Sequence, residues 1–132
     1  MTAQFLLKLG LVAIGLGLSA CERQVSFSAD VAPILATACA QCHAGGGEGQ
    51  ASSGLSLATY DEVMAGTSYG AVVVPGSSMS SALYLTVAGA TDPAIHMPPH
   101  HAGKLAMGSG EPLSPRQIET IRTWIDQGAR DN

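Results

Sequence analysis

Cys39-Ala40-Gln41-Cys42-His43 is the most informative stretch of this chain of 132 residues. Two thiols spaced three positions apart on a helical turn can each add to one vinyl group of a porphyrin, and the imidazole of the next residue can then reach the iron. The spacing therefore predicts one covalent haem c attached through Cys39 and Cys42, with His43 as the proximal iron ligand.

The same two cysteines have alternative uses, as a redox disulfide or as half of a zinc site. A zinc site needs two further ligands at recognisable spacing, and the sequence contains no second Cys-x-x-Cys pair. A non-haem thiol protein therefore stays as an alternative to the haem protein.

Residues 1–20 have the pattern of an export signal. Lys8 supplies a positive charge, and residues 9–18 form an apolar run that is too short for a membrane span. Leu18-Ser19-Ala20-Cys21 then resembles a bacterial lipobox, which implies cleavage before Cys21 and acylation of its thiol. An ordinary secretory signal with a coincidental cysteine is the alternative.

The remaining chain is predicted to be a short tether, residues 21–27, followed by a single domain, residues 28–132. Fully extended, Glu22 to Phe27 reach roughly 20 Å, which keeps the domain near a membrane surface. Glu22, in place of Asp, directly after the cysteine resembles lipoproteins passed on to the outer membrane. We therefore expect a lipid-anchored protein that faces the periplasm, at the outer rather than the inner membrane where the host has both.

Composition and charge narrow the classes of partner. The chain holds two Phe, three Tyr and one Trp, so a large flat cofactor would help to fill its small core. Residues 21–132 carry five basic and ten acidic side chains, a formal charge of −5. This charge argues against nucleic acid and favours redox protein partners with a basic docking surface.

Helical patterns surround the motif. Asp30 is the expected N-cap of a helix that has Pro33 in its first turn and runs into Cys39. The apolar stripe of this helix recurs at helical spacing and comprises Val31, Ile34, Leu35 and Ala38. The glycine-rich residues 44–49 are expected to end the helix in a flexible turn, since no Lys-Ser/Thr follows to make a phosphate loop.

Two short helices are expected in the middle of the chain. Thr59 should cap residues 60–65, and Ser80 or Ser81 should begin the second helix. Residues 70–75 between them are β-branched, but no partner strand with matching alternation is evident, so a buried connecting segment is predicted.

The last helix has the clearest boundary signals. Ser114, Pro115 and Gln117 form a capping box with proline at the first helical position, and the helix should continue to about Gln127. Trp124 widens its apolar face and is interpreted as core packing rather than as part of an electron path.

Met97-Pro98-Pro99 offers a sixth ligand for the iron. A neutral thioether favours ferrous iron, and the prolines restrict Met97 to extended backbone conformations. Met107 is the competing candidate, and Met97 could also be a simple gap filler.

Histidines cluster around this segment at His96, His100 and His101. Together with Met97 and Met107 they could bind copper, or a histidine could replace the methionine at the iron.

The order of several segments is similar to the planctomycete-type cytochrome c domain, a monohaem c-type family. The segments are Asp30-Val31-Ala32-Pro33-Ile34-Leu35, Cys39 to His43, Gly54-Leu55-Ser56-Leu57, Val73-Val74-Pro75-Gly76, Met97-Pro98-Pro99 and Trp124-Ile125-Asp126-Gln127-Gly128-Ala129. The resemblance implies a small all-α fold like class I cytochromes c, with the haem helix near the N-terminus, a capped C-terminal helix and long loops. It also implies Met97 as the distal ligand. The stretch from His100 to Glu111 is longer than the family pattern.

These observations predict an electron carrier in the bacterial cell envelope and not an enzyme. A haem enzyme or gas sensor is the alternative and requires a labile sixth ligand. Peroxide chemistry would also need an acid–base group such as His96 or His100. A thiol or copper protein is the third class.

Overall fold

The computed structural model describes residues 23–99 and 111–132 of the chain. Within these residues the fold is helical without a strand, and the pairing of Thr67 with Gly70 is an isolated bridge. The prediction of an all-α fold is therefore confirmed. The export signal with Cys21, and the loop that carries His100, His101 and Met107, lie outside the described residues.

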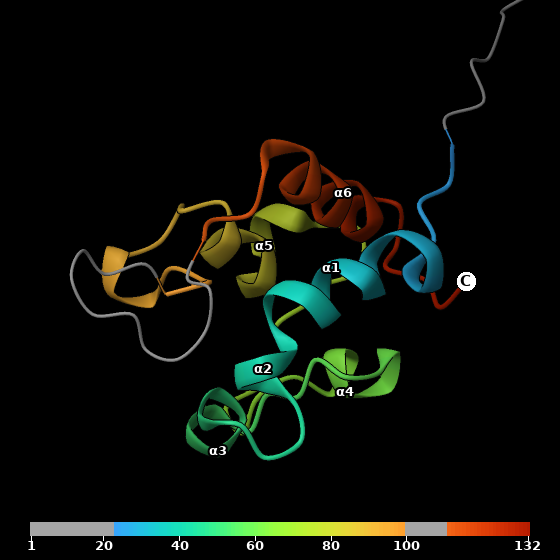
Figure 1. Ribbon diagram of the computed structural model, residues 1–132. Coiled ribbons are helices and arrows are strands. Elements are labelled where there is room, and N and C mark those ends of the chain that lie inside the picture. The colour runs from blue at the N-terminus through green and yellow to red at the C-terminus, as the bar shows by residue number, and fades with distance from the viewer. Residues whose placement is uncertain (1–22, 100–110) are drawn as a thin grey trace, which may run out of the picture.

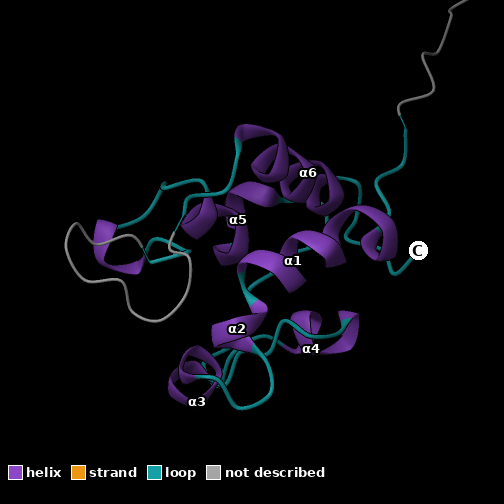
Figure 2. Ribbon diagram, viewed as in Figure 1, coloured by secondary structure: helices purple, strands orange, loops and turns teal. Residues whose placement is uncertain are grey.

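Short helices and helical turns follow one another along the described chain. They are η1 (Phe27–Val31), α1 (Ala32–Ala38), α2 (Ala40–His43), α3 (Glu48–Ser53), α4 (Tyr60–Ala65), η2 (Ser78–Ser80), α5 (Ala82–Val87), η3 (Pro93–Ile95) and α6 (Pro115–Asp126). In Figure 1, α6 lies over α5 and α1, while α2, α3 and α4 lie on the other side of α1. η1 runs directly into α1, and loops and turns connect most of the other elements (Figure 2). None of the helices in the described part of the chain is both long enough and apolar enough to cross a bilayer.

The first helical turn begins earlier than predicted, and Asp30 is not its N-cap. Ser26 is the N-cap, and its hydroxyl accepts a hydrogen bond from the backbone N–H of Ala29 at 3.1 Å. Asp30 lies inside the turn, where its carboxylate accepts the N–H of Ser26 at 2.9 Å and pairs with Arg23 at 3.0 Å. The prediction was wrong because an aspartate near a helix start can also act from within the first turn, where Asp30 accepts the N–H of the N-cap residue itself.

Residues 23–27, expected as part of a tether, are hydrogen bonded to the C-terminal end of the domain. The Gln127 side chain accepts the N–H of Val25 at 2.8 Å and donates to the carbonyl of Arg23 at 3.1 Å. The backbone N–H of Phe27 donates to Asn132 Oδ1 at 3.0 Å. The chain is thus attached to α6 from Arg23 onward.

The core joins η1, α4 and α6 through an aromatic cluster. The ring of Phe27 lies 5.2 Å from that of Tyr60 and 5.4 Å from that of Trp124. Trp124 is 1% exposed, and its indole N–H donates to the carbonyl of Arg130 at 2.9 Å. This burial confirms the interpretation of Trp124 as core packing. The hydrogen bond to Arg130 satisfies the indole N–H, which would otherwise be buried without a partner.

The C-terminal helix confirms its predicted boundaries to within one residue. Ser114 Oγ accepts the N–H of Gln117 at 3.3 Å, and Gln117 Oε1 accepts the N–H of Ser114 at 2.9 Å, which completes the capping box. The helix ends at Asp126, whose carboxylate accepts the N–H of Ser78 at 2.8 Å. This bond connects α6 to η2.

The middle helices also match their predicted starts, with Thr59 as the N-cap of α4 and Ser81 as that of α5. The turn predicted for residues 44–49 was too long, because α3 already begins at Glu48. Gly54 ends α3 in the left-handed conformation, with φ of 78°. The high glycine content concealed this helix, since glycine is a poor helix former.

Candidate haem site

One turn of helix carries the three residues of the motif. Helix α1 is interrupted at Cys39, where φ is −124° and ψ is −35°, and α2 follows as a single turn. The N–H of His43 donates to the carbonyl of Cys39 at 2.9 Å, and the N–H of Cys42 donates to the same carbonyl at 3.1 Å. These two bonds hold both thiols and the imidazole on one turn, as attachment to a single porphyrin requires.

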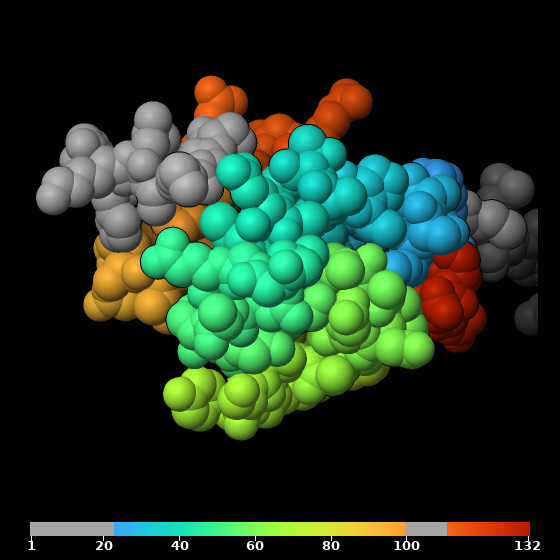
Figure 3. Space-filling model, turned by 60° about the horizontal axis from the view of Figure 1, so that its bottom comes forward, coloured from blue at the N-terminus to red at the C-terminus, as the bar shows by residue number. Residues whose placement is uncertain are grey.

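The motif forms part of the wall of a cavity of about 420 Å³. The apolar residues of the remaining lining are Ala38, Leu55, Leu57, Val72, Ala82, Leu83, Val87, Ile95, Met97, Pro98 and Pro99, and Thr37, Ser52, Ser53, Thr67 and Thr86 add hydroxyl groups. Glu48 is the one acidic or basic chain among the described lining residues, apart from the thiols and the imidazole. The segments that line the cavity adjoin one another on the face shown in Figure 3, where α2 and α3 lie beside residues 93–99.

The imidazole of His43 is buried and oriented by a backbone group. Its Nδ1 lies 3.3 Å from the carbonyl oxygen of Leu55, and its own carbonyl accepts the N–H of Leu57 at 2.7 Å. A carbonyl can only accept, so this contact assigns the proton to Nδ1 and leaves the Nε2 lone pair for a metal. Sequence reasoning missed the role of Leu55, because a backbone carbonyl leaves no signature in residue type.

The two cysteines are free thiols in different surroundings. Cys39 is buried, and this burial, together with the neighbouring Cys42, raises the pKa of its thiol to about 11. At neutral pH Cys39 is therefore protonated and a weak nucleophile in the folded protein. Cys42 is half-buried on the same cavity wall.

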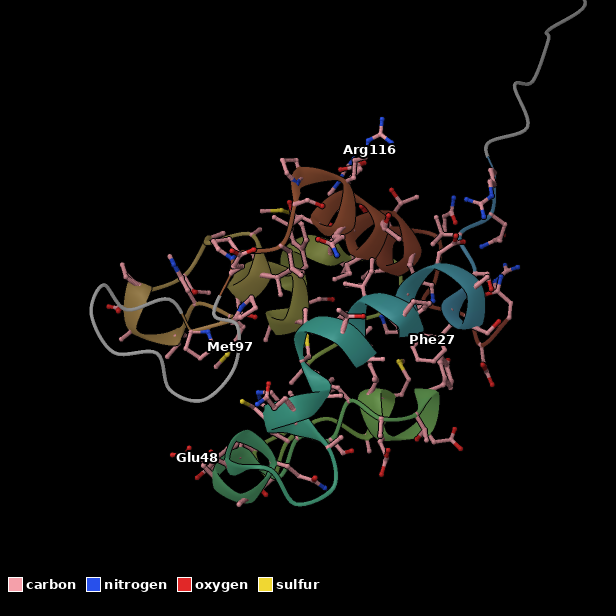
Figure 4. The ribbon with its side chains drawn as sticks, viewed as in Figure 1. Phe27, Glu48, Met97 and Arg116 are labelled. Carbon is pink, nitrogen blue, oxygen red and sulfur yellow. The ribbon has the colours of Figure 1, made fainter. Side chains whose placement is uncertain are left out.

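The structure brings Met97 to the same cavity as the motif. Its backbone N–H donates to the carbonyl of Thr86 in α5 at 3.2 Å, and Pro98 and Pro99 line the cavity beside it. Figure 4 shows Met97 on the loop that lies across from α2. Ligation by Met97 remains a prediction, with Met107 outside the described residues as its alternative.

Of the three clustered histidines, His96 lies within the described residues, and its position differs from that of the cavity-lining residues. His96 is half-buried, its Nε2 lies 3.0 Å from the carbonyl oxygen of Thr91, and it is not among the lining residues of the cavity. Within residues 23–99 and 111–132 no three His, Cys, Asp or Glu side chains group together as a metal site. The predicted copper site depends on residues beyond these ranges and stays a prediction.

The donors and walls of the cavity fit a haem. Two thiols can hold it, an imidazole presents Nε2, a thioether reaches the same space, and apolar side chains suit a flat apolar ring. The volume lies within the range of small-molecule and cofactor sites. A helical domain with this site is a cytochrome, which is a haem-binding protein of the electron-transfer type.

The comparison with known families agrees with this class. Residues 39–101 match the family model described as Planctomycete cytochrome C, and this part of the chain is a planctomycete-type cytochrome c domain. The matched residues include both the Cys-x-x-Cys-His motif and Met97-Pro98-Pro99. No curated protein and no solved structure matches the chain.

Proposed function

We propose that this protein carries single electrons through one covalently attached haem c in the bacterial cell envelope. The observation that supports this proposal is the convergence of Cys39, Cys42, His43 and Met97 on one apolar cavity. A bound haem supplies an iron that alternates between the ferrous and ferric states. The chain would hold the group through two thiols, would offer an iron ligand from each of two segments, and would limit the access of water with its apolar side chains.

The contacts of Met97 favour a carrier over a haem enzyme or gas sensor. Its backbone is bonded to Thr86, and two prolines follow it, so the thioether can stay in place in both oxidation states. His96, the described candidate for an acid–base group, lies outside the cavity lining and faces the Thr91 carbonyl. A closed sixth position suits electron transfer and opposes ligand exchange.

Two spectroscopic measurements test the proposal. The pyridine haemochrome spectrum of purified protein should show one c-type haem per chain, which stays with the polypeptide after acid–acetone extraction. The reduced protein should bind carbon monoxide slowly or not at all. Extraction of the haem would refute covalent attachment, and ready binding of carbon monoxide would favour the enzyme or sensor.

We further propose that Cys21 is acylated and anchors the domain to a membrane. The lipobox supports this, and Arg23 is already bonded to Gln127, so Glu22 alone would separate the acylated residue from the domain. Mass spectrometry should find a diacylated or triacylated Cys21 at the mature N-terminus, since more than one chain is needed for firm anchoring. Fractionation should recover the protein in the outer membrane, and a soluble form with another N-terminus would refute the anchor.

The net charge supports a redox partner with basic residues around its own site. Among the described residues that line the cavity, Glu48 is the acidic one. Attraction of a basic partner would therefore come mainly from the charge of the whole domain. Electron transfer with such a partner should be faster at low than at high ionic strength, because salt screens this attraction. Equal rates across that range would contradict electrostatic docking.

A further inference from the structure

Helix α3 approaches the proximal histidine at a glycine. A Cβ atom placed on Gly49 would lie 2.7 Å from Cε1 and 2.8 Å from Nε2 of the His43 ring. Carbon atoms in ordinary contact are about 3.5–4.0 Å apart, so no side chain at position 49 fits between α3 and the imidazole. Gly49 and His43 both line the cavity, and the ring atoms nearest to Gly49 include Nε2, the nitrogen that would bind a metal.

Backbone conformation does not explain a glycine at this position. Gly49 lies in the first turn of α3, and its φ is outside the left-handed region that Gly54 occupies. Alanine is the better helix former, so glycine here costs helix stability. What the glycine supplies is space beside the ring.

The ring of His43 has little freedom to move away. Its Nδ1 is held by the Leu55 carbonyl, its main chain is hydrogen bonded to Cys39 and Leu57, and the residue is 9% exposed. Rotation of the ring would break the contact with Leu55. Displacement of α3 would disturb its packing on α2, where Gly47 also approaches the motif, with a Cβ position 2.6 Å from the carbonyl oxygen of Cys42.

We propose that Gly49 is a positioning residue for the proximal ligand. The Leu55 carbonyl at Nδ1 and the bare Cα of Gly49 beside Cε1 and Nε2 restrict the position of the imidazole, and they would thereby set the plane in which it meets an iron. This inference rests on the proposed function, because it takes His43 as an iron ligand. It adds a residue outside the Cys-x-x-Cys-His motif whose effect is exerted through the ring.

Gly49→Ala in the holoprotein tests this role, with Ala51→Gly as the matched control. Ala51 is exposed on the same short helix, so the control weakens α3 without touching the ring. Gly49→Ala should keep its covalent haem but change the g-values of the low-spin ferric electron paramagnetic resonance spectrum, shift the reduction potential and lower the melting temperature. Ala51→Gly should lower the melting temperature and leave the spectrum and the potential unchanged.

The outcomes separate this inference from the proposed function. A wild-type spectrum and potential in Gly49→Ala, with a melting temperature equal to or above that of the wild type, would overturn the role of Gly49 and leave the carrier intact. Absence of covalent haem from the wild-type protein would instead refute the proposed function itself.

A second pair of variants applies if Gly49→Ala yields no holoprotein. In His43→Gly, free imidazole can supply the missing ligand, and because it is not tethered to the chain it can adjust its plane. Addition of imidazole should then give a low-spin spectrum both in His43→Gly and in the double variant His43→Gly/Gly49→Ala. Recovery in His43→Gly without recovery in the double variant would show that Gly49 acts otherwise than through the tethered ring, and would overturn the inference.

Discussion

Nδ1 of His43 lies 3.3 Å from the carbonyl oxygen of Leu55, and twelve positions separate the two residues in the chain. The carbonyl decides which nitrogen of the ring carries the proton, and so which nitrogen can bind iron. It would also restrain the ring when the charge of a bound iron changes. Small structural change between oxidation states is what an electron carrier requires, since rearrangement slows electron transfer.

The distal ligand is tested by comparing two methionines. Met97→Ala should abolish the weak far-red band of thioether-ligated ferric haem, lower the reduction potential and open the reduced iron to carbon monoxide. Met107→Ala should do none of these, because Met97 is already held at the cavity by Thr86. Visible spectra and redox titration of both variants make the comparison, and the reverse pattern would assign Met107 as the ligand.

Glu48, at the start of α3 (Figure 4), is expected to tune the reduction potential, because this exposed residue is among those that line the cavity with the predicted haem ligands. A negative charge there stabilises the ferric over the ferrous state. Glu48→Gln should therefore raise the potential, most clearly at low ionic strength, where screening is weak.

Glu62→Gln is the matched control for this change. Glu62 is exposed in α4 and is not a lining residue of the cavity, so its replacement should shift the potential less. Equal shifts in the two variants would mean that only the total charge matters.

Ser81 is expected to contribute more to stability than its exposed neighbours. It is fully buried, its hydroxyl accepts the N–H of Val74 at 2.8 Å, and it donates to the carbonyl of Ser77 at 2.8 Å. Ser81→Ala leaves both backbone groups without this partner and should lower the free energy of unfolding by about 1–3 kcal/mol. Denaturant titration measures this loss, and exposed Ser80→Ala should stay within about 0.5 kcal/mol of wild type.

The pH dependence of stability should reveal the role of Asp30. The backbone N–H of Ser26, and then the guanidinium of Arg23, hold the pKa of this carboxyl below its usual value of 3.8. A lowered pKa in the folded state means that the stabilisation is fully present above pH 3.8 and is lost as the pH falls through the folded pKa.

Asp30→Asn should accordingly lower the melting temperature at neutral pH, while its difference from wild type shrinks in acid below pH 3.8. Thermal unfolding across a pH series measures the effect. A difference that is the same at every pH would attribute the loss to packing and not to charge.

Several features could be predicted from the sequence because they depend on near neighbours. The capping box of Ser114 and Gln117 and the N-cap Thr59 involve residues within one helical turn, so their spacing already contains the geometry. The Cys-x-x-Cys-His motif is local in the same way. The start of the first helix is an exception. Ser26 and Asp30 are both residue types that favour an N-cap, and only the folded chain shows that Ser26 takes this position.

The remaining features required the tertiary structure. Leu55 orients His43 through its backbone carbonyl. Every residue has this group, so the residue type at position 55 could not predict the contact. In the sequence, Gly49 looks like part of a turn, and only the folded chain shows that α3 packs against the imidazole at this residue. Gln127 binds the chain at Val25 across 102 positions of sequence.

The sequence alone therefore determined the chemistry that the chain can offer, which is two thiols, an imidazole and a thioether, and the helical stretch that contains the Cys-x-x-Cys-His motif. Only the tertiary structure decided that Met97 lies at the same cavity as His43 and which groups restrain the ring. The physical reason is that helix caps and motifs arise from bonds between neighbouring residues. A cavity arises from the packing of segments that are distant in the chain.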